Sequence, residues 1–142
     1  MNAVARALDA NSVPLSSVGG LAVADVATIL FLVVLGELRH GVDVLGNPGR
    51  VLATAGQFLV GWLVVATLVG AYGDRAFEGG PRTVQLAVGT WLGGAGIGLT
   101  LRGTRYFAGD SPLSFALVMA GLGAVALATV RLVFVTQLDA KT

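Results

Sequence analysis

Residues 18–38 read VGGLAVADVATILFLVVLGEL, and this stretch decides what kind of fold the chain can adopt. Only two of its side chains are charged, Asp25 towards one end and Glu37 at the other. A helix of about 20 apolar residues, rising about 1.5 Å per residue, spans the hydrocarbon core of a bilayer. The stretch therefore predicts a transmembrane helix.

The composition of the whole chain points the same way. Its 142 residues are 55% hydrophobic and 12% charged, with a mean hydropathy of +0.82. Soluble domains carry about 25% charged residues, so this chain has roughly half the charge of a surface that faces water. The net charge of +1 gives no reason to expect a nucleic-acid partner. We expect a multi-pass protein of the cell membrane, in contact with the lipid bilayer.

Apolar blocks of bilayer length recur along the chain, with short connections between them. The four blocks cover approximately residues 18–38, 51–72, 83–101 and 112–135. They predict an all-α fold, a four-helix transmembrane bundle with short loops, that forms a single domain over residues 18–138. Residues 1–17 and 139–142 are expected to be tails.

The basic residues leave the orientation in the membrane open. Four spans put both termini on one side, and the positive-inside rule needs an excess of Lys and Arg on one face. The terminal side has five and the other side four, namely Arg6, Arg75, Arg82, Arg131 and Lys141 against Arg39, Arg50, Arg102 and Arg105. The alternatives are a weak signal in a small protein and a dual topology, in which copies insert both ways.

Asp25 is the most informative single residue. A span that began at Asp25 would be too short for the bilayer, so the carboxylate lies at least one turn inside the apolar region. Arg131 lies one turn before the apolar end of the last block, at a similar depth from the same face. We expect Asp25 and Arg131 to form an intramembrane ion pair, with snorkelling of Arg131 to the surface as the alternative.

A second polar layer is expected near the opposite face. It consists of Arg39, His40, Gln57 and Arg102. Arg39 follows Asp25 by almost four helical turns, so both share a face that should point into the bundle, whereas Glu37 and His40 should meet water or headgroups. The amide of Gln57 needs a partner across the bundle. The alternative for Arg39 and Arg102 is ordinary anchoring at helix ends.

Glycines in the third block are expected to pack helices together. Gly89, Gly93, Gly94 and Gly98 form small-xxx-small pairs, which permit close approach in lipid. The contact is either within one bundle or across a homodimer seam. Trp62 and Trp91, inside their spans, are expected to pack or to donate to a buried acceptor.

Catalytic motifs do not appear in the sequence. One histidine and no cysteine argue against the usual zinc sites, and neither HExxH nor GxSxG occurs. We therefore expect no enzyme, no metal and no cofactor.

The order of these features resembles a known family of small four-span membrane proteins. The residues that carry the resemblance are Asp25, LGELRHG (35–41), TAGQFLVGWL (54–63), Trp91, Gly98, Arg102, SFALV (114–118) and Arg131. The family is the uncharacterised prokaryotic domain of unknown function 3054, and the resemblance covers roughly Ala24 to Phe134. It implies an integral membrane protein with a recurring polar set of Asp25, Arg39, His40, Arg102 and Arg131, and it implies no activity.

The chain departs from the family pattern at two positions. Gln57 stands where proline usually precedes the phenylalanine, and Val130 stands where tryptophan usually precedes the last arginine. A kink at position 57 and an aromatic cover over Arg131 are therefore in doubt.

Two function classes follow. The first is a non-catalytic membrane scaffold or accessory subunit that binds a partner membrane subunit or a second copy. The alternative is an oligomeric transporter or channel for a small ion or solute, with Asp25 and the layer of Arg39 and Arg102 as its polar sites. The apolar stretch between the two polar layers favours the scaffold or a closed pore.

Overall fold

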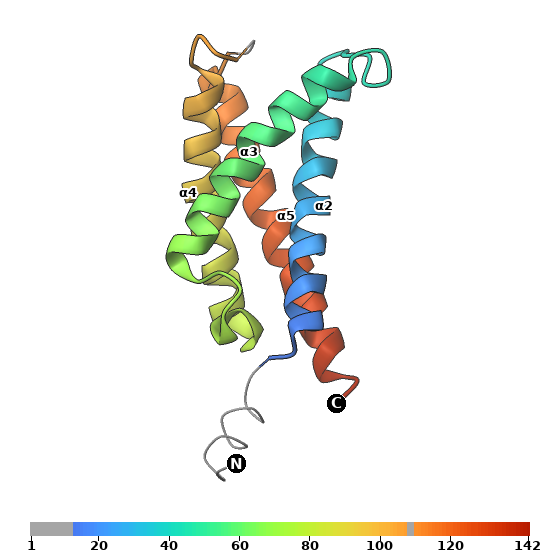
Figure 1. Cartoon of the computed structure of the whole chain (residues 1–142), viewed down its shortest axis with the longest axis vertical. Coiled ribbons are helices and arrows are strands. Elements are labelled where there is room, and N and C mark those ends of the chain that lie inside the picture. Colours follow the sequence, from blue (N-terminus) through green and yellow to red (C-terminus); the bar gives the residue numbers. More distant parts are fainter. Residues whose placement is uncertain (1–12, 108–109) are drawn as a thin grey trace.

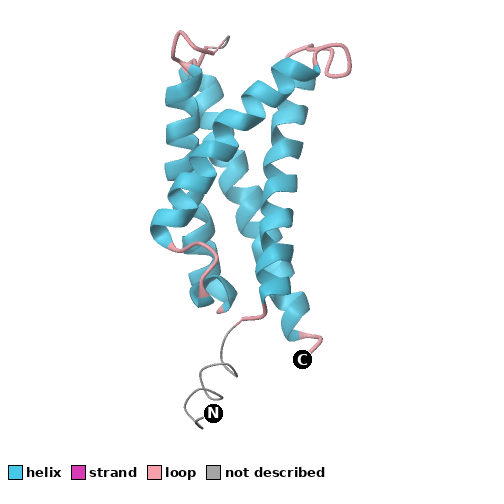
Figure 2. Ribbon diagram, viewed as in Figure 1, coloured by secondary structure: helices cyan, strands magenta, loops and turns pink. Residues whose placement is uncertain are grey.

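The computed structural model of the chain describes residues 13–107 and 110–142. These residues form four long helices and one short 3₁₀ helix, and no strand occurs among them (Figure 2). The elements are α2 (Leu15–Arg39), α3 (Pro48–Val69), η1 (Asp74–Phe77), α4 (Gly80–Arg102) and α5 (Leu113–Asp139). The prediction of an all-α four-helix bundle is confirmed.

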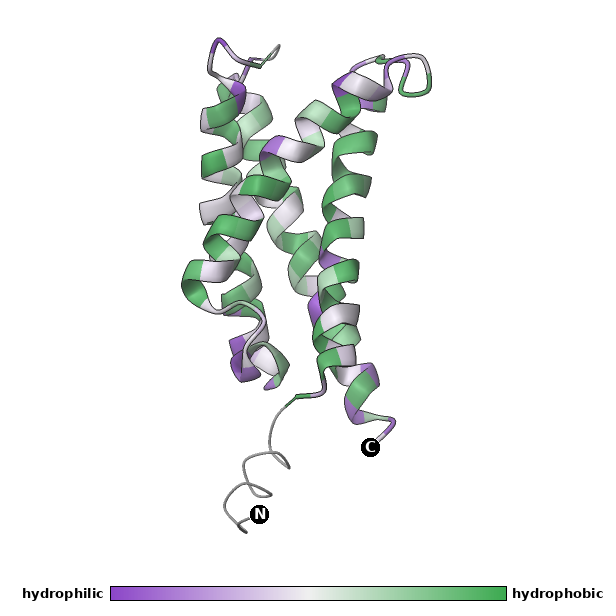
Figure 3. Cartoon of the chain, viewed as in Figure 1, coloured by the Kyte–Doolittle hydropathy of each residue, from purple (hydrophilic) through white to green (hydrophobic). Residues whose placement is uncertain are grey.

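All four long helices are long and apolar enough to cross a membrane. Apolar side chains cover most of their length, and hydrophilic residues gather near the helix ends (Figure 3). Large apolar side chains such as Phe31, Leu63 and Val125 point outward and are exposed. Water disfavours such a surface and lipid accepts it. The chain is therefore a multi-pass membrane protein.

The helix bounds differ from the predicted blocks mainly at the ends. Residues 1–12 of the expected N-terminal tail lie outside the described residues, and α2 already begins at Leu15. The last helix continues to Asp139 and takes up the start of the expected C-terminal tail. The second span ends at Val69 rather than at 72, because Gly70 has φ +66° and a left-handed backbone, which closes the helix.

The helices run side by side, with the start of α2 and the end of α5 at one end of the molecule (Figure 1). We call this the terminal end, and η1 lies there too. The connections α2–α3 and α4–α5 lie at the other end, which we call the loop end. Helix α3 crosses the molecule diagonally, from the loop end of α2 to the terminal half of α4. It packs more extensively against α4 than against α2.

Close contact between α3 and α4 rests on glycine. A Cβ on Gly94 would collide with the backbone of Gly61 and Trp62, and a Cβ on Gly98 would collide with Phe58. Gly93 faces the side chain of Val65. The sequence therefore identified Gly93, Gly94 and Gly98 correctly as contact positions and missed Gly61, their counterpart on α3.

Gly89 does not pack against another helix of this bundle, so of the two alternatives for it only a contact with a second copy stays a prediction. Gly89 is exposed, and a Cβ there would have no neighbour within 4 Å. Gly89 precedes Gly94 by five residues, which is about 140° around a helix. The two glycines therefore lie on different faces of α4, and only the face of Gly94 meets α3.

Aromatic side chains fill the middle of the bundle. Phe58, Trp62 and Trp91 are fully buried, with ring centroids 5.9 Å apart for Phe58 and Trp91 and 6.5 Å apart for the two tryptophans. Gly123 of α5 leaves the space that the Trp91 indole occupies. The Trp91 Nε1 donates to the backbone carbonyls of Met119 and Ala120, at 3.1 and 3.2 Å. This aromatic layer separates the two ends of the molecule.

Candidate functional site

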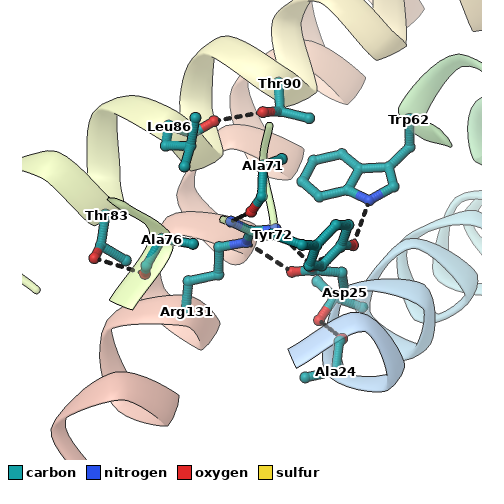
Figure 4. A network of polar contacts seen from close by, with 11 residues as sticks. Ala24, Asp25, Trp62, Ala71, Tyr72, Ala76, Thr83, Leu86, Thr90 and Arg131 are labelled. Atoms are coloured by element: carbon teal, nitrogen blue, oxygen red, sulfur yellow. Dashed lines mark hydrogen bonds and ion pairs between the residues drawn. The ribbon is translucent and has the colours of Figure 1, made fainter. Parts of the chain in front are cut away.

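The structure brings Asp25 of α2 and Arg131 of α5 together at the terminal end (Figure 4). Arg131 Nε donates to Asp25 Oδ1 at 3.1 Å, and Arg131 Nη2 donates to Asp25 Oδ2 at 2.7 Å. Both side chains are 0% exposed. A two-pronged contact of this kind is the strongest geometry for an arginine and a carboxylate. Each charge therefore has the partner that its burial requires.

The turn after α3 supplies the remaining partners of this pair. Arg131 Nη1 donates to the Ala71 carbonyl at 2.8 Å, and the Tyr72 hydroxyl donates to Asp25 Oδ2 at 2.8 Å. Trp62 Nε1 in turn donates to the Tyr72 hydroxyl at 2.9 Å. The left-handed Gly70 turns the chain back so that Ala71 and Tyr72 reach the pair. We call these residues, with Asp25 and Arg131, the Asp25 network.

Aromatic rings cover the guanidinium of Arg131. Its Cζ lies 5.0 Å from the ring centroid of Tyr72 and 5.3 Å from that of Trp62. Cation–π contacts of this kind are strongest where water is excluded. The aromatic cover that the substitution of Val130 placed in doubt thus comes from other elements, the end of α3 and the turn after it.

Tyr72 is a member of the site that the sequence analysis missed. It lies in the turn after α3, outside the spans, and burial together with the charge of Asp25 raises its pKa to about 12. The hydroxyl therefore keeps its proton and remains a donor to the carboxylate. Only its position shortly after the break at Gly70 hints at this role in the sequence.

The turn itself is held by α4. Thr83 Oγ1 donates to the Ala76 carbonyl in η1 at 3.0 Å and accepts a bond from the Gly79 amide at 3.0 Å (Figure 4). Thr83 is fully buried. All four long helices, or the segments directly attached to them, therefore take part in fixing the Asp25 network.

A second polar group lies at the loop end, and Glu37 is at its centre. Thr54 Oγ1 donates to Glu37 Oε1 at 3.0 Å, and Arg50 Nε donates to Glu37 Oε2 at 3.1 Å. Arg102 Nη1 donates to the Thr54 hydroxyl at 3.1 Å, and Arg102 Nε donates to the Asp110 carbonyl at 3.0 Å. We call Glu37, Arg50, Thr54 and Arg102 the Glu37 cluster.

The expectation that Glu37 meets water while Arg39 points into the bundle is wrong. Glu37 is 5% exposed, whereas Arg39 is exposed. The two lie about 200° apart around α2, so that one turns outward when the other turns inward. The first turns of α3 cover the Glu37 side. Helix α5, which contacts Asp25 through Arg131 at the terminal end, diverges from α2 towards the loop end (Figure 1), and Arg39 is exposed there.

The other members of the predicted layer are placed apart. His40 is exposed, with its ring 6.5 Å from that of Phe115. Gln57 is buried, but its Oε1 has no hydrogen-bond partner among the described residues. It lies at the close α3–α4 contact, where Gly98 faces its backbone carbonyl and offers no side chain. The structure thus joins Arg102 to Glu37 through Thr54 and leaves Arg39, His40 and Gln57 outside that cluster.

A cavity of about 330 Å³ opens beside the Glu37 cluster. Helices α2, α3, α4 and α5 all contribute to its wall, and its polar lining residues are the Glu37 cluster together with His40 and Asp110. A hollow of about 570 Å³ adjoins it between α2 and α5. Among the described residues no three His, Asp or Glu side chains gather in a way that fits a metal ion.

Fold and sites together define a small multi-pass membrane protein that contains an enclosed ion pair and an open polar cavity. The family described as "Protein of unknown function (DUF3054)" matches residues 22–134. The chain belongs to this family, and the family predicted from the sequence is thereby confirmed. No curated protein and no solved structure matches the chain.

Proposed function

We propose that the protein is a non-catalytic scaffold or accessory subunit of the cell membrane. The observation that carries this proposal is the Asp25 network. Its carboxylate and its guanidinium are fully enclosed, and each is bonded to protein groups on several sides. A group that binds or moves an ion has to exchange those partners for the ion or for water. An ion pair held in this way instead fixes the helices relative to one another.

The core between the two polar regions supports the same reading. Phe58, Trp62 and Trp91 are fully buried there, beside Ile29 and Leu127. A transport path needs polar groups or space for water across the whole apolar core. The aromatic layer offers neither in this conformation. A transporter or channel is the alternative, and it requires this layer to open.

The partner surface expected of a scaffold is the outer face of α4. Gly89 and Gly96 are exposed there, and a Cβ at either position would have no neighbour within 4 Å. They lie seven residues apart and therefore on one face. Small residues permit close helix approach in lipid, so this face suits a helix of a partner membrane subunit or of a second copy.

Flux measurements distinguish the two function classes. The purified protein, reconstituted in liposomes, is tested for proton and anion flux under imposed gradients. The Asp25→Asn and Arg102→Gln variants are measured in parallel. We expect no flux above that of empty liposomes. Flux that either variant abolishes would establish the transporter instead.

Single cysteines test the partner surface, because the chain has none of its own. Gly96→Cys places a thiol on the outer face of α4, and Val125→Cys places one on the exposed face of α5 as a matched control. Oxidative cross-linking in native membranes should give a larger product for Gly96→Cys alone. Equal cross-linking of both variants, or of neither, would argue against this surface.

A further inference from the structure

Arg102 of the Glu37 cluster is a buried cation without an acidic partner. It is 8% exposed, and its two hydrogen bonds go to the Thr54 hydroxyl and to the Asp110 backbone carbonyl, which are both neutral. Among the described residues no carboxylate lies within ion-pair distance of its guanidinium, because the Glu37 carboxylate pairs with Arg50. Its remaining contact is with the Phe115 ring, 4.9 Å from the centroid. A buried charge requires a counter-charge, and Arg131 at the terminal end has one.

The cavity beside Arg102 and the hollow that adjoins it together carry a small excess of positive charge. The ionised side chains of the cavity are Glu37, Asp110, Arg50 and Arg102, which sum to zero, and Arg39 in the wall of the hollow brings the total to +1. Asp110 lies at the exposed rim, where its carboxylate accepts a hydrogen bond from the Ser111 amide. The fork of N–H donors on a guanidinium matches the oxygens of a phosphate group. Arg102 thus offers donors for a phosphate, and the two spaces together have the matching charge.

The adjoining hollow is apolar and opens between α2 and α5. It shares five lining residues with the inner cavity, so the two spaces are neighbours; these are Leu32, Gly36, His40, Phe115 and Met119. Its own additional lining is Leu35, Arg39, Val118 and Leu122. From Arg39 back to Leu32 the wall on α2 extends over eight residues, a rise of about 10 Å. The hollow therefore runs from the loop end into the apolar part of the bundle.

The depth of these groups matches the layering of a bilayer. Arg39 and Arg102 are the last residues of their helices, at the level where headgroups lie. The apolar hollow continues from there towards the membrane centre, along two helices whose neighbouring side chains face lipid. A molecule with a phosphate at one end and an alkyl chain at the other meets both parts at once. Free phosphate would leave the apolar part unused.

We propose that this composite space binds an anionic phospholipid, with the phosphate against Arg102 and one acyl chain in the hollow between α2 and α5. The lipid enters sideways from the bilayer, past Arg39 and His40 at the rim. This site lies at the opposite end from the Asp25 network, and the proposal does not depend on the function proposed above.

Lipid titration of the purified protein tests the proposal. The protein in a neutral detergent is titrated with phosphatidylglycerol or with phosphatidylcholine of the same acyl chains, and bound lipid is counted by native mass spectrometry. Phosphatidylglycerol should bind about tenfold or more tightly than phosphatidylcholine, because both offer the phosphate but the choline cation of phosphatidylcholine cancels its negative charge beside the arginines. Equal binding of the two lipids would overturn the proposal.

Variants assign the binding to this site. Arg102→Gln removes the cation, and Gly36→Leu adds an apolar side chain to the wall that the two spaces share, at a position where a Cβ has no neighbour within 4 Å. Each should weaken phosphatidylglycerol binding by about tenfold. The matched controls are Arg105→Gln, an exposed arginine at the same end, and Gly19→Leu on the same helix, with equal space around it. Both controls should stay within about twofold of the original chain.

Two results would contradict the assignment. The first is competition by inorganic phosphate. If phosphate displaces phosphatidylglycerol at similar concentrations from the original chain and from Gly36→Leu, the site binds an anion and makes no use of the acyl chain. Unchanged phosphatidylglycerol binding by Gly36→Leu, a variant that retains all charged residues, would place the lipid elsewhere. The second test holds even when Arg102→Gln fails to fold.

Discussion

Asp25 and Arg131 carry opposite charges, and both side chains are fully buried within the bundle. Removal of one charge leaves the other buried without its partner, whereas removal of both leaves two neutral groups. The pair is therefore expected to show strong coupling between its two members. Because Arg131 also donates to the Ala71 carbonyl and Asp25 also accepts from Tyr72, each single change disturbs the turn after α3 as well.

The coupling predicts a particular pattern in a double-mutant cycle. Asp25→Asn and Arg131→Gln should each lower the free energy of unfolding by about 3 to 5 kcal/mol. The double variant should lose less than the sum, by about 0.5 to 3 kcal/mol. Unfolding in mixed micelles, titrated with a denaturing detergent, measures all four proteins. Losses that simply add would contradict a shared role of the two charges.

The hydroxyl of Tyr72 allows a smaller and cleaner test. Tyr72→Phe removes one donor to Asp25 and leaves the Trp62 indole N–H without its acceptor. A loss of about 1 to 3 kcal/mol in unfolding free energy is expected, because a buried polar group is left unpaired. Tyr106→Phe is the matched control, since Tyr106 is 77% exposed and its hydroxyl only accepts a bond from the neighbouring Arg105. An equal effect of both changes would contradict the role of Tyr72.

Prediction of single residues from the sequence succeeded where only the position along the helix axis decides which side chains meet. It failed where the rotation of a helix about its axis decides which side chains are covered. Counting helix rise from one membrane face is enough to match Asp25 with Arg131. The choice between Glu37 and Arg39 depends on which side of α2 is covered by α3, and no residue count supplies that. Tyr72 was missed because its position depends on the left-handed turn at Gly70.

At the scale of the helices, α4 has two different glycine faces. Gly94 and Gly98 meet α3, where a side chain would strike backbone, and Gly89 and Gly96 face outward into open space. The spacing is four residues for the first pair and seven for the second, and either spacing places two glycines on one side of a helix. It therefore indicates a helix with close contacts and leaves undecided which glycines make them. The number and approximate bounds of the spans, in contrast, follow from apolar length alone.

Alanine substitution on the two faces should have opposite consequences. Gly94→Ala inserts a methyl group between two backbones and should destabilise the bundle by about 1 to 3 kcal/mol. Gly96→Ala should be neutral or stabilising by up to about 1 kcal/mol, because alanine favours helix more than glycine does. Thermal unfolding in detergent, followed by loss of the monodisperse species, compares the two. Equal losses would contradict the assignment of the faces.

At the scale of the whole molecule, the four helices place the turn after α3 and the end of α5 at the same end (Figure 1). Cysteine replacements at Asp74 and Lys141 should therefore be labelled from the same side of the membrane by an impermeant maleimide. A cysteine in place of Leu45, which lies in the α2–α3 connection, should be labelled from the other side. Opposite labelling at 74 and 141 would contradict the fold. Labelling of every position from both sides would reveal the dual topology that the even spread of Lys and Arg leaves open.

The ion pair that joins α2 to α5 also has a consequence for synthesis. Arg131 follows Asp25 by 106 positions in the chain. A ribosome adds about 5 to 20 residues per second, so the carboxylate waits roughly 5 to 20 s before its counter-charge has been made. During that interval the newly inserted α2 contains the Asp25 carboxylate without Arg131, the arginine that pairs with it in the finished protein. A chain whose synthesis stops before α5 would keep the Asp25 carboxylate without its ion-pair partner. This unpaired charge would distinguish an incomplete copy from a finished one inside the membrane.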